Sequence, residues 1–375
     1  MNLGVLGPLL GASPEFQRLA KSLQKEHAAV SVQVISDATP FLLATLWREF
    51  GHPMLVVTPG AEDARRLYDQ VLLWTGDDPQ VLHFTESETL PFERLVADMD
   101  TARQRIHVLS TLSSGETTAP LVIASVAATA QKTIDKVAFE NSTHTLSRGQ
   151  TIDPDSVVDQ WRRMGYRVEP TVDVPGLVSR RGGIIDIYPL GADAPARIEL
   201  WGDEIDSIRL FDPETQRSTE LVDSVAIIPA QETLPGLTVR DEFDRILGSV
   251  NLSNCIEAAR TRIREELDLL LDGLEVDDLE FYAGMFNRGS LYDYLPDNAL
   301  SIVLRPTDIA EAAGEIDERT HELRRVKEGR GELPAGFPSS HFLSAESDTK
   351  ASRIRRRLEI TPWGAEELTR DEIHL

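Results

Sequence analysis

The residues best suited to chemistry in this chain are arginines and a tryptophan placed among short apolar runs between positions 180 and 218. Three of these runs predict strands, at 184–187, 198–200 and 205–210. Alternation along the second strand puts Arg197, Glu199 and Trp201 on one face, and the residues between them on the face that a core would bury. Arginine and aromatic side chains carry much of the binding energy at protein interfaces, so this face suits recognition of a partner.

The rest of that segment reads as the framework of a small domain. Two turn sequences separate the strands, Pro189-Leu190-Gly191 and Gly202-Asp203. The core is expected to include four apolar residues: Ile184, Ile187, Ile198 and Leu200. The acidic pair Asp203-Glu204 could in principle do acid-base work, but it lies in a hairpin turn, where Gly-Asp is ordinary turn chemistry.

Templates for enzymes and metal centres are missing from the sequence. It has no Gly-x-Ser-x-Gly, no His-Glu-x-x-His, no dinucleotide glycine fingerprint and no Cys-x-x-Cys. The single cysteine, Cys255, excludes an internal disulfide and a cysteine-based metal site, and is expected to be a small core residue. The eight histidines form no close pair at ligand spacing. We therefore predict no catalytic residue, no metal and no cofactor.

Strand and helix patterns alternate from the N-terminus to about residue 142. Ser13-Pro14 and Thr39-Pro40 each predict the start of a helix. Further helices are expected at 61–74 and through Arg103, Ile106 and Leu109. Strands are expected from about 30, 54, 81 and 121. This alternation predicts a mostly parallel sheet with crossover helices. It resembles the first RecA-like lobe of a superfamily 2 helicase.

The ATP-binding motifs of such a lobe are not in this sequence. A phosphate loop needs glycines whose N–H groups surround the phosphates, followed by Lys-Ser or Lys-Thr. Residues 36–40 stand at that place as Ser-Asp-Ala-Thr-Pro. The later strand at 299–304 runs into Arg305-Pro306-Thr307 instead of the acidic pair that would hold magnesium. Asp277-Asp278 is a weak substitute, which we expect to be a solvated helix or loop face.

Two changes of pattern predict the domain organisation. A polar, turn-rich stretch near residue 142 is followed by Asp155, read as a helix cap, with a helix through Trp161 that ends at Gly165. After about residue 235 the pattern is helical again. We therefore expect the first half of a larger domain at 1–142, an inserted α+β domain at 143–235, and the second half of the larger domain at 236–375. In the second half, Tyr292 and Tyr294 could stack on nucleic acid, but core packing is favoured.

Charge and composition limit the kinds of partner that the chain is expected to bind. The net charge of −24 argues against nucleic acid, which favours basic surfaces; any DNA binding should be no tighter than about 10⁻⁴ M. Six lysines accompany 32 arginines, which suits bidentate protein contacts but also follows from GC-rich coding. One basic cluster stands out, Arg353, Arg355, Arg356 and Arg357, whose role the sequence leaves open between phosphate, an acidic neighbour and a solvated face. Lack of a signal peptide and of long apolar runs predicts a cytoplasmic protein without membrane contact.

The 180–218 segment resembles the inserted domain shared by the bacterial transcription-repair coupling factors (Mfd) and the excision-repair helicase UvrB. Its tail, FDPETQRS, looks like the coupling factors in particular. The resemblance implies a degenerate RecA-like parallel-sheet domain split by a domain that docks UvrA. By motif position it also implies that Arg181, Arg197 and Trp201 contact UvrA; the family often has phenylalanine at the third position. Arg181 could instead only bind a carbonyl, and Trp201 could be a half-buried core ring.

The expected function is a non-catalytic adaptor of transcription-coupled nucleotide excision repair that recruits UvrA. In the coupling factors, RNA polymerase, DNA and ATP are engaged by downstream domains that this sequence does not include. Two other functions stay open: UvrB-type ATP-dependent damage verification, and an autoinhibitory module that masks its docking face. Affinity for UvrA, oligomeric state and any masking cannot be read from the sequence.

Overall fold

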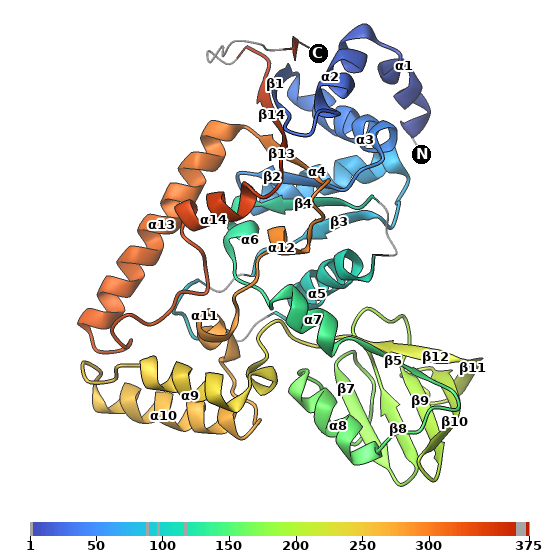
Figure 1. Cartoon of the computed structure of the whole chain (residues 1–375), viewed down its shortest axis with the longest axis vertical. Coiled ribbons are helices and arrows are strands. Elements are labelled where there is room, and N and C mark those ends of the chain that lie inside the picture. Colours follow the sequence, from blue (N-terminus) through green and yellow to red (C-terminus); the bar gives the residue numbers. More distant parts are fainter. Residues whose placement is uncertain (1–2, 88–89, 96–97, 116–118, 365–372, 375) are drawn as a thin grey trace.

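The computed structural model describes residues 3–87, 90–95, 98–115, 119–364 and 373–374. Its largest feature is a seven-stranded parallel sheet in the order β15-β1-β14-β13-β2-β4-β3 (Figure 1). The strands are β1 (Ala29–Val34), β2 (Met54–Thr58), β3 (Val81–Phe84), β4 (Leu121–Ser125), β13 (Leu300–Leu304), β14 (Arg356–Pro362) and β15 (Ile373–His374). Every residue of β2, β4 and β13 is buried, as expected of a parallel sheet covered on both faces.

The sheet is built from two distant parts of the chain. β14 pairs with β1 so that Val32 faces Ile360, and β13 pairs with β2 so that Ile302 faces Val56. The strands from residues 300–362 therefore lie between β1 and β2 rather than at an edge. Neither half can complete this sheet alone, which confirms the expected α/β domain split by an insertion.

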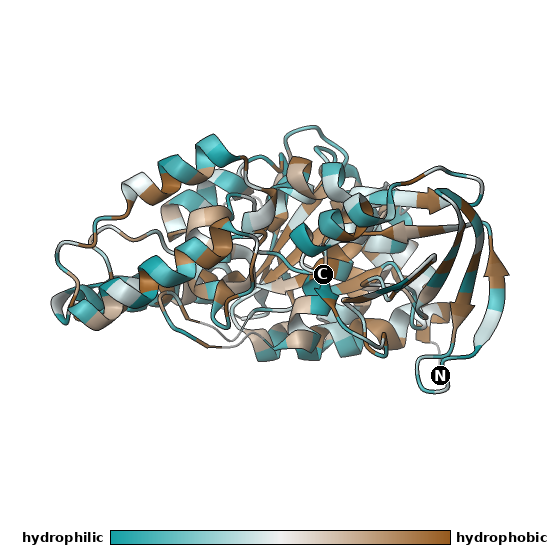
Figure 2. Ribbon diagram, turned by 90° about the horizontal axis from the view of Figure 1, so that it is seen from below, coloured by the Kyte–Doolittle hydropathy of each residue, from teal (hydrophilic) through white to brown (hydrophobic). Residues whose placement is uncertain are grey.

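Helices connect the strands of this sheet and cover its faces. In the first half they are α1 (Gly7–Gly11), α2 (Pro14–Leu23), α3 (Thr39–Phe50), α4 (Ala61–Thr75), α5 (Met99–Ser114), α6 (Val126–Ala130) and α7 (Lys136–Ser142), with single turns η1 (Leu3–Leu6) and η2 (Ser36–Ala38). The expected cap at Ser13 is confirmed, because its Oγ accepts a hydrogen bond from the Phe16 amide at 3.2 Å. Figure 2 shows strands that are mostly hydrophobic and helices that carry both colours.

The segment that follows contains two further sheets. Strands β6 (Arg167–Val168), β7 (Leu177–Arg181), β8 (Ile184–Ile187), β9 (Ala196–Trp201), β10 (Glu204–Phe211) and β11 (Ser218–Val222) form one, in the order β11-β10-β9-β8-β7-β6. β5 (His144–Ser147) and β12 (Ser224–Ile227) form the other. Helix α8 (Pro154–Arg163) buries Trp161 in the same core as Ile185, Ile187 and Ile198. Its cap is Asp153, whose carboxylate accepts from the Asp155 amide, so the prediction of Asp155 as the cap is wrong by two residues.

The last part of the chain is mainly helical outside β13 to β15. Its elements are η3 (Pro235–Leu237), α9 (Arg240–Ser249), α10 (Glu257–Leu271), η4 (Leu279–Tyr282), α11 (Ala283–Phe286), α12 (Leu291–Tyr294), α13 (Pro306–Gly329) and α14 (Ser344–Ala351). The pair α9 and α10 has a core of its own around Phe243, Ile263 and Leu267. Tyr292 and Tyr294 are buried, which confirms packing over stacking on nucleic acid.

The domain boundaries near 142 and 235 remain our proposal. It is supported by strand pairing, because each described strand between residues 144 and 227 pairs only within that segment. None of the helices in the described part of the chain combines the length and apolar character needed to cross a bilayer.

Candidate docking site

Two glycine turns and a common register place the expected contact residues on one face of the six-stranded sheet. Arg181 on β7 is opposite Ile184 on β8, which is opposite Glu199 on β9. Arg197 and Trp201 flank Glu199 at two residues on either side, so they point the same way. The structure thus brings Arg181, Arg197 and Trp201 to one surface, which we call the outer face.

Trp201 is the most exposed of the large hydrophobic side chains described, at 85%. It ends β9 immediately before Gly202, whose φ of 63° is a left-handed conformation that favours glycine. The neighbouring turn, Gly182-Gly183, approaches β9 closely, and a Cβ on Gly183 would lie 3.2 Å from the Leu200 carbonyl oxygen. Trp201 is therefore not a core ring, and its indole lies free beside a turn without side chains.

Arg181 lies at the end of β7 with its side chain exposed. One of its guanidinium nitrogens donates a hydrogen bond to the Pro170 carbonyl. The preceding residue, Arg180, has the opposite orientation and pairs with Asp155 at the start of α8. Arg181 does bind a carbonyl, as the sequence left open, and its exposed side chain also remains part of the outer face.

Arg197 is held more firmly than the sequence suggested. Its Nε and Nη2 donate to the two carboxylate oxygens of Asp186 at 2.7 and 2.9 Å, and its guanidinium lies 4.8 Å from the Phe211 ring centre. The hydrogen bonds to Asp186 raise the pKa of Arg197 above its ordinary value. Asp186 is buried, so removing Arg197 would leave a buried carboxylate unpaired. Truncation of Arg197 is therefore expected to destabilise the fold as well as to change the outer face.

Further residues of the outer face were missed or misplaced. Ile184 was assigned to the core, but it is 39% exposed because alternation sends Ile185 and Ile187 inward instead. Arg209 on β10 and Leu221 on β11 lie in the row of Arg197, and Leu221 is 54% exposed. The alternation of side chains along β8 could have predicted that Ile184 lies on the outer face. The position of Leu221 on this face, by contrast, depends on the pairing of β10 with β11.

A cleft of about 380 Å³ lies where the parallel strands β1, β2, β13 and β14 end. In open α/β sheets this edge is the usual place for a ligand. The expected phosphate-loop position, residues 36–40, forms η2 and the start of α3 here. Arg305 follows β13 and pairs with Asp63 and, at 3.3 Å, with Asp308. An arginine paired to two carboxylates therefore stands at the place of the magnesium-binding acids.

We predict that this cleft neither binds ATP tightly nor hydrolyses it. Without a glycine-rich turn and a lysine, the β- and γ-phosphates have no cradle, and Arg305 stands where magnesium would be held. Isothermal titration calorimetry with magnesium-ATP should give no heat of binding at micromolar concentrations. A dissociation constant in the micromolar range would contradict the prediction and favour the UvrB-type function.

The other candidate residues have structural partners. The four clustered arginines contact Asp293, Glu26, the Asn298 carbonyl and Glu359, respectively, so this basic run lies against its own domain. Cys255 is buried, and burial raises the pKa of its thiol, in keeping with a small core residue. Asp277 is exposed, but Asp278 is buried, so the prediction of a solvated acidic pair is wrong for Asp278.

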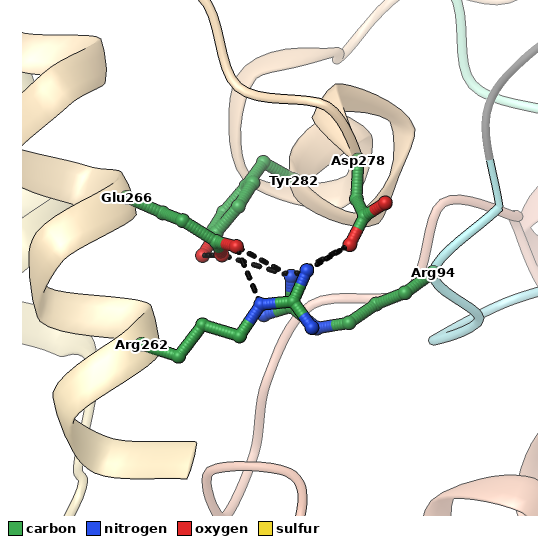
Figure 3. A network of polar contacts seen from close by, with 5 residues as sticks. All are labelled: Arg94, Arg262, Glu266, Asp278 and Tyr282. Carbon is green, nitrogen blue, oxygen red and sulfur yellow. Dashed lines mark hydrogen bonds and ion pairs between the residues drawn. The ribbon is translucent and has the colours of Figure 1, made fainter. Parts of the chain in front are cut away.

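Asp278 belongs to a network of five residues that joins the loop after β3 to the α9–α10 region (Figure 3). Arg94 pairs with Glu266 at 2.8 Å and with Asp278 at 3.2 Å, and Arg262 pairs with both acids. The Tyr282 hydroxyl donates to Glu266 at 2.5 Å. Although burial opposes it, these donors hold the pKa of Glu266 below its ordinary value.

A second polar cluster anchors the end of the inserted segment. Arg105 on α5 is buried and pairs with Glu232 at 2.5 Å, and it also donates to Gln131 and the Thr85 carbonyl at 2.8 Å. The sequence signal for Arg105 was its place four residues before Leu109, which is the spacing of neighbours on one side of a helix. Glu280 lies nearby, where burial and the charge of Glu232 raise its pKa to about 7, against an opposing effect of Arg105.

Glu280 is expected to make stability fall as pH rises from about 4.5 to about 7. In that window the unfolded chain releases the proton that folded Glu280 keeps, so unfolding is favoured as pH rises. Glu280→Gln should therefore be more stable than the parent by on the order of 1–3 kcal/mol at pH 8, and nearly equal to it at pH 4.5. Thermal melts at both pH values test this, with the exposed Glu275→Gln as the control. An equal difference at both pH values would contradict it.

Comparison with known proteins shows which protein families this chain resembles. The sequence profile described as the UvrB interaction domain matches residues 145–232. The transcription-repair-coupling factor of Bacillus subtilis (strain 168) is 30% identical over 329 residues, which is 83% of this chain and 27% of that protein. That of Myxococcus xanthus is 28% identical over 345 residues, 89% of this chain and 28% of that protein. UvrABC system protein B of Thermosipho africanus is 27% identical over 252 residues, 64% of this chain and 38% of that protein.

The chain spans about a quarter of the length of the coupling factors that it matches. Similarity to UvrABC system protein B covers less of the chain than similarity to either of these coupling factors. The resemblance expected from the sequence is thus confirmed: over most of its length the chain is related to the transcription-repair-coupling factors, in their N-terminal UvrB-homology module, and it carries a UvrB interaction domain at residues 145–232.

Proposed function

We propose that this chain is a non-catalytic adaptor module of transcription-coupled nucleotide excision repair, which binds UvrA through the outer face and recruits it. The observation that carries the proposal is an indole 85% exposed on the same sheet face as an exposed arginine, Arg181, within the match to the UvrB interaction domain. Aromatic rings and arginines are enriched among the residues that carry the binding energy of interfaces, because a partner that covers the ring buries a large apolar area. RNA polymerase, DNA and ATP would be engaged by other domains of a full-length coupling factor.

The arrangement around the cleft supports the non-catalytic part of the proposal. The strand edge that would hold ATP is bordered by the Arg305–Asp63 pair, and the basic cluster is engaged within its own domain. A UvrB-type motor would need magnesium-binding acids at the strand edge and basic residues that are free to contact DNA. Fluorescence anisotropy with duplex DNA separates the two functions, because tight and salt-sensitive binding by this chain would support the motor.

The direct test is to mix the purified chain with UvrA on a sizing column at physiological salt. Co-elution of the two proteins is the expected result. Separate elution at concentrations up to about 100 μM, with both proteins folded by circular dichroism, would show that the chain by itself is not a docking module. A docking face that is masked by a distant domain would prevent co-elution only in a longer protein that contains that domain. The isolated chain should therefore bind UvrA at least as tightly as the longer protein does.

A further inference from the structure

We propose that the outer face has two tiers, in which Trp201 and Arg181 contact the partner while Arg197 is a positioning residue that acts through Asp186. This inference rests on the proposed docking of UvrA. It changes the role of Arg197, which was expected to contact UvrA, and it adds Asp186, which no sequence pattern singled out. The sequence resemblance treated Arg181, Arg197 and Trp201 as equivalent contacts, and the geometry separates them.

The donors of Arg197 are already used within the domain. Its Nε and Nη2 form a bidentate pair with Asp186, and its Nη1 lies 3.4 Å from the Gln216 carbonyl oxygen. The side chain is 22% exposed and that of Asp186 is 11% exposed. A fork with both arms on one carboxylate has little left for bidentate contact with a partner. Trp201 and Arg181, by contrast, are exposed.

The Arg197 contacts hold in place the backbone to which Arg181 is bound. The guanidinium covers Phe211, which packs with Val172 and Leu177 in a small cluster on the outer side of the sheet. Gln216, which accepts from Arg197 through its backbone, donates its amide Nε2 to the Val172 carbonyl at 3.1 Å. Val172 is two residues from Pro170, whose carbonyl accepts from Arg181.

The same pair fixes the strand that carries Trp201. Asp186 and Arg197 are directly opposite each other on β8 and β9, so their ion pair closes the two strands across the face. Trp201 stands four residues further along β9, where the strand ends. Loss of the pair should therefore loosen both contact residues without removing either of them.

A mutant cycle on the isolated chain tests this, with affinity for UvrA measured by surface plasmon resonance at a temperature well below each melting transition. Arg197→Ala and Asp186→Ala should each weaken binding roughly tenfold, and the double variant should be no weaker than the weaker single one. Exchanging the charges, Arg197→Asp with Asp186→Arg, should restore most of the affinity, because the two positions are opposite neighbours. A residue that only stabilised the fold would shift the melting temperature and leave the affinity of the folded chain unchanged.

Direct contact by Arg197 predicts the opposite pattern. Asp186→Ala would then free the guanidinium and keep or tighten binding, while Arg197→Ala would lose it and the exchanged pair would not recover. If the exchanged variant does not fold, the comparison of Asp186→Ala with Arg197→Ala still decides. The control is Arg180→Ala, which removes another arginine–aspartate pair of the same domain, with Asp155, from the opposite side of β7.

Failure of the inference and failure of the docking proposal give different results. If Trp201→Ala and Arg181→Ala bind UvrA like the parent, or if the parent does not bind, docking on the outer face is wrong and the two tiers with it. If those variants lose binding while Asp186→Ala does not, docking stands and the positioning role is overturned.

Discussion

Replacing Trp201 by alanine is expected to weaken binding of UvrA by about 5- to 1000-fold, a cost of roughly 1 to 4 kcal/mol. The indole is 85% exposed in the free chain, so a partner that covers it would bury most of the surface of the ring. Burial of this apolar area favours binding. The ring is not part of a core cluster, so truncation leaves no cavity and the melting temperature should stay within about 2 °C of the parent.

Surface plasmon resonance beside a thermal melt measures both quantities. Trp201→Phe should keep most of the affinity, because it preserves an aromatic anchor. A matched control is Trp363→Ala, since Trp363 is also exposed, at 56%, but follows β14 in the other domain. Parent-like binding by Trp201→Ala, or equal losses in both tryptophan variants, would place the docking site elsewhere.

Arg94→Ala is expected to lower the free energy of unfolding by about 2 kcal/mol, because two largely buried carboxylates each lose one of the two arginines that pair with them. Glu266 and Asp278 have side chains only 13% and 11% exposed, and both would lose Arg94 (Figure 3). The guanidinium also lies 3.9 Å from the Phe281 ring centre, so packing is lost as well. Urea unfolding followed by circular dichroism measures the effect. The control is Arg264→Ala, which removes an exposed arginine from α10, the helix that carries Glu266.

The penalty of Arg94→Ala should also depend on pH. The folded pKa of Glu266 lies below its ordinary value of 4.5, so its contribution is present above that value and is lost as pH falls through the folded pKa. The difference between parent and variant should therefore be full at pH 7 and shrink in acid, as the pH falls below 4.5. A difference that stays constant down to the acid transition would show that the arginine acts through packing with Phe281 alone.

Local features of this chain followed from its sequence because they depend on neighbours a few residues apart. Alternation predicted that Arg197 and Trp201 share a face, Ser13-Pro14 predicted a helix start, and Gly202-Asp203 predicted a hairpin; the structure has all three. Alternation along β8 also indicates that Ile184 is exposed, although its apolar character alone led to its assignment to the core. The missing phosphate loop was readable for the same reason, since its chemistry needs a short contiguous motif.

The remaining features depend on which distant segments meet. β13 and β14 lie between β1 and β2 because buried strands pair wherever a complementary register exists, and no local pattern names the partner across more than 240 residues. The burial of Asp278 required Arg94, which is 184 positions away in the chain. The engagement of Arg197 required Asp186 on the adjacent strand. A charged side chain looks the same in the sequence whether it meets water or a buried partner, because desolvation and pairing are set by the surroundings that only the folded chain assembles.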